Sequence, residues 1–135
     1  MQQYPVIINV RDRLSPLVDL VNWLERIGQN NIWLCDNAST YPPLVQYLEA
    51  SPHHVVRNGT NLGHRAPWLS GLVTELGLDQ HFIVTDPDVV PSEECPDDVL
   101  EVFRNTLDEN PEFDKVGFSL RLDDLPATYA HRSDV

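Results

Sequence analysis

Short apolar runs alternate along this chain with longer stretches in which apolar residues recur every three or four positions. The apolar runs have the length of strands and lie at residues 6–10, 32–35, 54–57, 82–85 and 116–120. Runs that are apolar on both faces are typical of parallel strands covered by helices. The pattern therefore predicts five strands joined by helical crossovers.

Helix signals separate the predicted strands. Ser15 is predicted to cap a first helix that begins at Pro16 and ends before Gly28, because serine accepts from free N–H groups and proline tolerates the first helical position. Trp68 is expected to be a core aromatic of the third helix. The further helices are predicted at Tyr41-Pro-Pro43, with the prolines in the first turn, from Pro67 to Gly77, and over residues 97–107.

This order of elements predicts an α/β fold with three α/β/α layers around a mostly parallel, Rossmann-like sheet, in a single domain over residues 1–135. Ligands of such sheets bind beyond the carboxyl ends of the strands. The residues that directly follow each strand are therefore the candidates for a binding site.

Charge is distributed unevenly along the chain. The formal net charge is −12, and residues 75–135 account for all of it with 16 acidic and 4 basic residues. Because an acidic field repels a phosphate backbone, we expect no nucleic-acid partner. A phosphorylated small ligand would need a bound cation, or a local group of arginines and backbone N–H groups, to hold it.

The sequence shows neither an apolar run of membrane-spanning length nor a signal peptide at its start, MQQYPVIINV. We therefore expect a soluble, cytoplasmic domain with no transmembrane segment. The two cysteines, Cys35 and Cys95, have no metal-ligand spacing and are expected to be reduced thiols, with Cys35 in a buried strand.

Charged and polar side chains follow four of the predicted strands. They are Arg11-Asp12-Arg13, Asp36-Asn37, residues 58–65 and Asp86-Pro-Asp88. Two carboxylates one residue apart can share one face of a hard cation such as Mg²⁺ or Mn²⁺, which keeps several waters and binds substrate phosphates. Many such pairs in acidic chains are solvated turns, but this one directly ends an apolar run, which favours a metal site.

Four parts of the chain are similar, in order, to motifs of one family. They are Val6-Ile-Ile-Asn-Val-Arg-Asp-Arg13, Leu34-Cys-Asp-Asn-Ala-Ser-Thr40, Asn61-Leu-Gly63 with Gly71, and Asp86-Pro-Asp88. Over nearly all its length the chain resembles the GT-A glycosyltransferases, and among them the inverting family 2 enzymes. The resemblance implies binding of a nucleotide-diphosphate sugar, a UDP-sugar, through Mn²⁺ or Mg²⁺ for glycosyl transfer to an acceptor.

The resemblance also implies roles for single residues. Asp36 would accept a hydrogen bond from the nucleotide base, and Arg11 would lie against the ring. Asp88 would ligate the metal, and Asp86 would face the ribose side. The implied nucleotide-binding residues are Val10, Arg11, Asp36, Asn37, Asn61, Gly63, Arg65 and Asp86, and the implied metal ligands are Asp88 and Asp86.

The chain departs from the family pattern in two places. Many relatives carry an arginine about five residues after N-x-G, where this chain has Trp68, and Arg65 is expected to substitute. An inverting enzyme also needs a general base for the acceptor hydroxyl, which lies beyond the fifth strand in this family. Asp123 and Asp124 are the candidates for that base, and we expect a donor-binding half with an incomplete or missing acceptor half.

Two other classes of function remain open. A haloacid-dehalogenase-like phosphatase would use Asp86 as nucleophile, Asp88 as acid/base and Asp123-Asp124 as a metal pair, but it leaves the 36–40 motif unexplained. A non-catalytic nucleotide-sugar-binding module needs no general base. Hydrolysis of a phosphomonoester would support the first class, and metal-dependent UDP-sugar binding without transfer would support the second.

Overall fold

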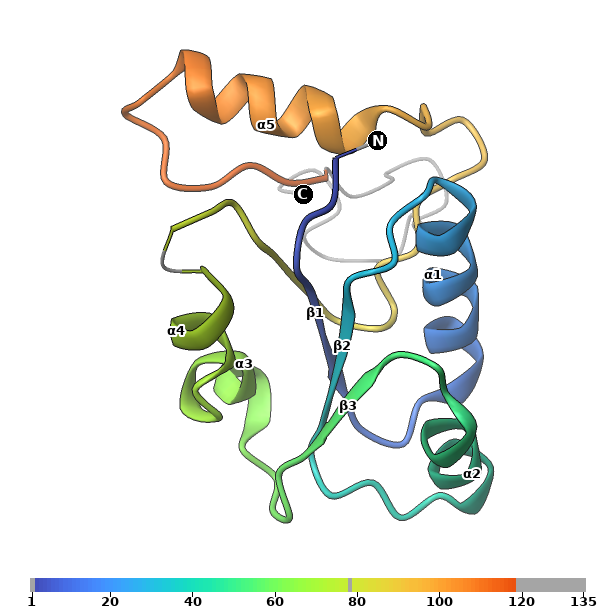
Figure 1. Cartoon of the computed structure of the whole chain (residues 1–135). Coiled ribbons are helices and arrows are strands. Elements are labelled where there is room, and N and C mark those ends of the chain that lie inside the picture. Colours follow the sequence, from blue (N-terminus) through green and yellow to red (C-terminus); the bar gives the residue numbers. More distant parts are fainter. Residues whose placement is uncertain (1, 78, 119–135) are drawn as a thin grey trace, which may run out of the picture. The chain divides into compact units, whose positions relative to one another are not determined.

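Four parallel strands form the sheet of the computed structural model, which describes residues 2–77 and 79–118 (Figure 1). They are β1 (Val6–Val10), β2 (Ile32–Asp36), β3 (His54–Arg57) and β4 (Ile83–Thr85), in the spatial order β3-β2-β1-β4. Because every strand pair is parallel, the carboxyl ends meet at one edge of the sheet. We call the last residue of each of the four strands, together with the residues that directly follow it, the carboxyl edge.

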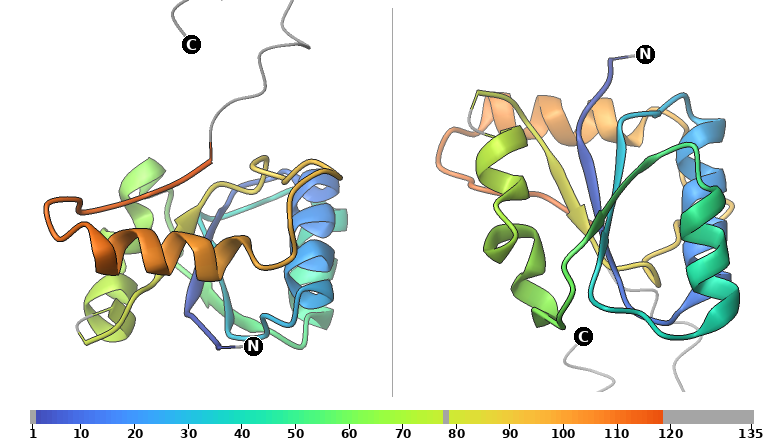
Figure 2. Two further views of the ribbon diagram at one scale, coloured as in Figure 1. Left: turned by 90° about the horizontal axis from the view of Figure 1, so that it is seen from above. Right: turned by 60° about the horizontal axis from the view of Figure 1, so that its bottom comes forward.

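Helices lie on both sides of the sheet (Figures 1 and 2). On one side are α1 (Leu14–Arg26) and α2 (Pro42–Ala50), and on the other are α3 (Ala66–Leu69) and α4 (Leu72–Gly77). Successive side chains of a strand point to opposite faces, so Ile8 packs in a cluster with Leu17, whereas Ile7 packs with Ala66. The α/β class and the parallel sheet are therefore confirmed.

The chain divides into two compact units between Asp97 and Asp98. The first contains the sheet, α1 to α4 and the short 3-10 helix η1 (Gly63–Arg65). The second contains α5 (Val99–Glu109), which carries Glu101 in its first turn, where a helix dipole favours an acid. In this second unit the rings of Phe103 and Phe118 meet edge to face, with centroids 5.0 Å apart.

Two predicted helices differ from the observed ones. The first begins at Leu14, so Ser15 lies inside its first turn and is not the cap; a positive φ of 55° at Asp12 turns the chain early enough for this start. The third predicted helix is divided into α3 and α4, because Gly71 adopts a φ of 87° that helices exclude. Trp68 is 51% exposed as a result, and its prediction as a core aromatic is wrong.

The predicted fifth strand over residues 116–120 is wrong for residues 116–118, which take no regular structure. Residues 119–120 lie outside the described part. Short apolar runs do not by themselves distinguish a strand from an irregular segment, because a strand also needs a hydrogen-bonded neighbour. Both Val116 and Phe118 are exposed.

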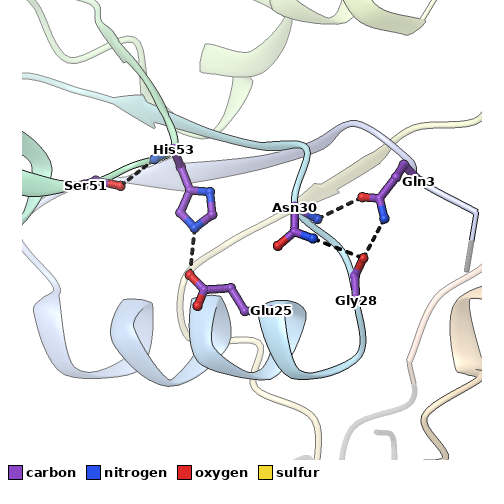
Figure 3. Close-up of polar contacts among 6 residues, drawn as sticks. All are labelled: Gln3, Glu25, Gly28, Asn30, Ser51 and His53. Carbon is purple, nitrogen blue, oxygen red and sulfur yellow. Dashed lines mark hydrogen bonds and ion pairs between the residues drawn. The ribbon is translucent and has the colours of Figure 1, made fainter.

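Polar side chains link neighbouring elements at the edge of the sheet opposite the carboxyl edge (Figure 3). Gln3 donates to the carbonyl oxygen of Gly28 and accepts from the backbone N–H of Asn30, which joins the segments before β1 and β2. Nε2 of His53 lies 2.7 Å from Oε1 of Glu25, and this contact joins the start of β3 to α1. These side chains hold elements together, which gives this edge a structural role.

No helix within residues 2–77 and 79–118 combines the length and the apolar character needed to cross a membrane. Both cysteines are free thiols, as predicted, and Cys35 is buried in β2.

Candidate functional site

The ends of β2 and β4 lie on either side of the end of β1. β1 is the neighbour of both strands, and its last residue, Val10, is in register with Asp36. Two strand spacings correspond to about 10 Å. On this spacing the Asp36 carboxylate and the Asp86-Pro-Asp88 turn form two separate groups, and not one set of ligands for a single ion with ligand distances of about 2 Å.

The side-chain amide of Asn37 ties the strand ends together. Its nitrogen donates to Oδ1 of Asn9 over 2.7 Å and to the carbonyl oxygen of Gly63 over 3.3 Å. Its oxygen accepts from Nδ2 of Asn58 at 3.0 Å and from the backbone N–H of Leu62 at 3.3 Å. An amide has two donor hydrogens and two acceptor lone pairs, so all four are used within the chain. Asn37 therefore has a structural role, and its contact with a nucleotide stays a prediction.

Asp36 presents a buried carboxylate at the end of β2, with 3% of the residue exposed. Its Oδ1 accepts from the backbone N–H of Ser39 over 3.3 Å. Ala38 adopts a φ of 55° within this turn, which lets the chain reverse over so few residues. A carboxylate has capacity for several hydrogen bonds, so one held by the chain in this way can also accept the imide N–H of a pyrimidine base.

Asp12 orders the neighbouring loop. Its Oδ1 accepts from the backbone N–H groups of Thr40 at 2.7 Å and Tyr41 at 2.9 Å, and its own N–H donates to Oγ of Ser39. The hydrogen bonds from Tyr41 and Thr40 hold the pKa of Asp12 below its usual value, and the charge of Arg11 acts weakly in the same direction. Asp12 therefore holds the backbone at the start of α2, and its carboxylate is already hydrogen-bonded within the chain.

Exposed arginines lie beside the aspartates at this edge of an acidic chain. Arg11 donates from Nη1 to the carbonyl oxygen of Asn37 over 2.8 Å, which holds its guanidinium across the end of β2. Guanidinium groups bind phosphates and stack on planar rings. The exposed arginines that lie at or beside the strand ends, among the described residues, are Arg11, Arg13, Arg57 and Arg65.

The loop between β3 and α3 is anchored to β1 through Gly63. The carbonyl oxygen of Gly63 accepts from Nδ2 of Asn9 over 3.1 Å, and its N–H donates to Oδ1 of Asn61 over 2.9 Å. Gly63 has a φ of 73°, a conformation that residues with a Cβ seldom adopt. Arg65 follows in η1 and is exposed. The structure thus brings Asn61, Gly63 and Arg65 to the carboxyl edge.

Asp86 and Asp88 are both exposed and flank the buried Pro87. The backbone N–H of Val89 donates to the carbonyl oxygen of Asp86 over 3.3 Å, which closes a turn. Oδ2 of Asp88 accepts from Nη1 of Arg13 over 3.0 Å, and these side chains are 51% and 62% exposed. This ion pair connects the loops after β4 and β1, and no sequence signal indicated it.

The donor set at this turn fits one kind of metal. Mg²⁺ and Mn²⁺ are commonly held by one or two carboxylates, with water and substrate phosphates completing the shell. Within residues 2–77 and 79–118, no group of three or more His, Cys, Asp or Glu side chains could hold a metal ion. The two carboxylates of the turn match that donor set, and metal binding there stays a prediction.

The predicted nucleotide-binding and metal-binding residues all lie at the carboxyl edge or in its loops, whereas Asp123 and Asp124 lie outside the described residues. Sequence reasoning placed the residues that organise this edge in the candidate segments but gave them no role. Asn9 left a signal, since it is a polar residue within the apolar run VIINV of a buried strand. The organising residues without a predicted role are Asn9, Asp12, Arg13, Ser39 and Asn58.

Comparisons of this chain with protein-family models, with curated proteins and with solved structures give no match. The resemblance to the GT-A glycosyltransferases therefore rests on the motifs and on the parallel sheet that carries them.

Proposed function

We propose that this chain is the nucleotide-sugar-binding half of a GT-A-type glycosyltransferase domain, with three α/β/α layers around a Rossmann-like sheet. Its ligand is a UDP-sugar, held through Mn²⁺ or Mg²⁺ at Asp86-Pro-Asp88. The proposal rests on one observation, which is that two kinds of carboxylate occupy separate positions at the carboxyl edge. A buried carboxylate, Asp36, lies on one side of β1, and an exposed carboxylate pair lies on the other.

The base binds at the end of β2 in this proposal. Asp36 accepts the imide N–H of uracil, a donor that cytosine lacks at the same ring position. Arg11 lies beside it, fixed by its hydrogen bond to the carbonyl oxygen of Asn37, and its planar guanidinium stacks on the ring. The network around Asn37 keeps these groups in place before the ligand arrives, which lowers the ordering cost of binding.

The diphosphate binds at the ends of β1 and β4. Asp86 and Asp88 are exposed, so both can reach a cation that also contacts phosphate oxygens. A divalent cation bound there stabilises the negative charge of the diphosphate leaving group as a Lewis acid. Arg65, exposed at the end of η1, supplies a further positive charge on the phosphate side.

Transfer needs a general base for the acceptor, and the candidates Asp123 and Asp124 lie outside the described residues. A non-catalytic nucleotide-sugar-binding module is therefore the second candidate function, and it uses the same donor site. The two cysteines are free thiols, which supports a reducing compartment such as the cytoplasm.

Calorimetry with UDP, GDP and CDP, each with and without Mn²⁺, tests the proposal. We expect UDP to bind with the highest affinity and Mn²⁺ to strengthen its binding, and we expect Asp88→Ala to abolish most of the Mn²⁺ effect. Asp97→Ala is the matched control, because Asp97 is an exposed aspartate paired with an arginine as Asp88 is. If none of the nucleotides binds under any condition, the donor-site proposal is wrong.

Activity assays separate the remaining classes. Release of UDP from a UDP-sugar in the presence of an acceptor panel supports a transferase, whereas tight binding with no turnover supports the module. Hydrolysis of a generic phosphomonoester that is lost in Asp86→Asn would instead support the phosphatase, in which Asp86 is the nucleophile.

A further inference from the structure

Two exposed Arg–Asp ion pairs in the first unit are alike in length and exposure. Arg13 Nη1 lies 3.0 Å from Asp88 Oδ2, and Arg26 Nη1 lies 2.9 Å from Asp97 Oδ1. They differ in position. Arg26 is the last residue of α1, whereas Arg13 precedes that helix and reaches across the carboxyl edge to the turn after β4.

The Arg13 pair involves an oxygen of the proposed metal ligand. A cation that binds the carboxylate of Asp88 competes with the guanidinium of Arg13, because two positive charges beside one exposed carboxylate repel each other. An exposed ion pair contributes little to stability, so displacing the guanidinium costs little. The released guanidinium stays within reach of the same turn, since Arg13 is only three residues after the last residue of β1.

We infer that Arg13 exchanges partners when the ligand binds. In the free chain it neutralises Asp88 and competes with the divalent cation, and in the complex it contacts the diphosphate. The inference rests on the proposed function for its second half, because only a phosphorylated ligand offers the new partner. Its first half concerns Asp88 and a divalent cation alone.

If Arg13 exchanges partners, Arg13→Gln should strengthen Mn²⁺ binding and weaken UDP binding. Arg13→Gln removes the competitor, so Mn²⁺ alone should bind more tightly, by roughly two- to five-fold for an exposed pair. The same variant also removes a phosphate contact, so UDP should bind more weakly at saturating Mn²⁺. A residue with a purely structural role would weaken both.

Mn²⁺ titration of the full chain, followed by the electron paramagnetic resonance signal of free Mn²⁺, measures the first half. The matched control is Arg26→Gln, which changes the net charge from −12 to −13 as Arg13→Gln does, and removes an equally exposed pair. We expect tighter Mn²⁺ binding in Arg13→Gln, no change in Arg26→Gln and loss of binding in Asp88→Asn. Equal Mn²⁺ affinity in wild type and Arg13→Gln, or no Mn²⁺ binding by either, overturns the inference.

Calorimetric UDP titration of the same variants measures the second half. Weaker UDP binding by Arg13→Gln, with Arg26→Gln unchanged, supports the new phosphate contact, and unchanged UDP affinity overturns it. Failure of the proposed function is a different result, because wild type then binds no UDP even with Mn²⁺ while the Mn²⁺ titrations still report on the competition at Asp88.

Discussion

The side-chain nitrogen of Asn37 donates to the side-chain oxygen of Asn9 over 2.7 Å, and this contact joins the ends of the two central strands. Asn9 in turn donates to the carbonyl oxygen of Gly63. The loop that carries Asn61 and Arg65 is thereby fixed to the same strand ends as Asp36. The candidate site is therefore organised by neutral amides, and its charged groups are placed around them.

Asn37→Ala should destabilise the fold. The substitution leaves Asn9, Asn58 and the N–H of Leu62 without their shared partner, and a buried polar group left unpaired costs about 1–3 kcal/mol. Urea denaturation measures the change in unfolding free energy. Asn22→Ala, on the exposed face of α1, is the control and should change stability by less than about 0.5 kcal/mol. Equal effects of the two substitutions would show that the network around Asn37 does not stabilise the fold.

Asp12→Asn should reduce stability at neutral pH by less than about 1 kcal/mol, since the carboxylate is open to solvent. Asparagine keeps an acceptor oxygen and tolerates the positive φ of this position, so the change isolates the charge. The pKa of Asp12 is lowered in the folded chain. The charged carboxylate therefore stabilises the fold fully above the unfolded pKa of about 3.9. This stabilisation is lost as the pH falls through the pKa of the folded chain.

The difference between wild type and Asp12→Asn should therefore be constant from pH 7 to pH 5 and disappear in stronger acid. Thermal unfolding at a series of pH values measures it. If the stability difference instead grew as the pH fell, the N–H groups of Thr40 and Tyr41 could not be stabilising the charged form of Asp12.

Asp36→Asn should weaken binding of the nucleotide base without destabilising the fold. The asparagine oxygen can still accept from the N–H of Ser39, so the melting temperature should stay close to that of wild type. The amide nitrogen that replaces the second carboxylate oxygen cannot accept the imide N–H of uracil, and hydrogen bonds to charged groups contribute about 1.5–3 kcal/mol, so UDP affinity should fall by about tenfold or more. Asp19→Asn, on the exposed surface of α1, is the control. Unchanged UDP affinity in a folded Asp36→Asn protein would remove Asp36 from the base site.

His53→Ala should destabilise the chain at the edge opposite the site. The His53 side chain is 8% exposed and bonds to Glu25, so its loss removes buried area and one hydrogen bond, at a cost of about 1–3 kcal/mol. His64→Ala, an exposed histidine, should have little effect. Urea denaturation compares the two, and UDP affinity should be unaffected by His53→Ala because no proposed ligand contact lies at that edge.

The sequence predicted the elements whose residues follow one period throughout. β1 and β3 have the predicted bounds, and α2 begins at the predicted prolines. The convergence of Asp36 and Asp86-Pro-Asp88 was predictable because parallel strands end at a common edge.

The remaining features depend on contacts between distant residues. The division between α3 and α4 depends on the backbone of Gly71, which an apolar periodicity cannot show. The Arg13–Asp88 pair joins residues 75 positions apart, and the side chain of Asn37 draws its partners from β1 and from the loop after β3. Trp68 is exposed because α3 is only one turn long and buries Ala66 and Pro67 instead.

The central claim is that a divalent cation binds between Asp86 and Asp88 when UDP is present. Paramagnetic broadening by Mn²⁺ in proton–nitrogen correlation spectra, recorded with UDP, locates the ion directly. We expect the amide signals of residues 11–13, 86, 88 and 89 to broaden first, while those of residues 28–31 at the opposite edge persist. Broadening that begins in the acidic segment 93–97, with residues 86, 88 and 89 unaffected, would contradict the claim.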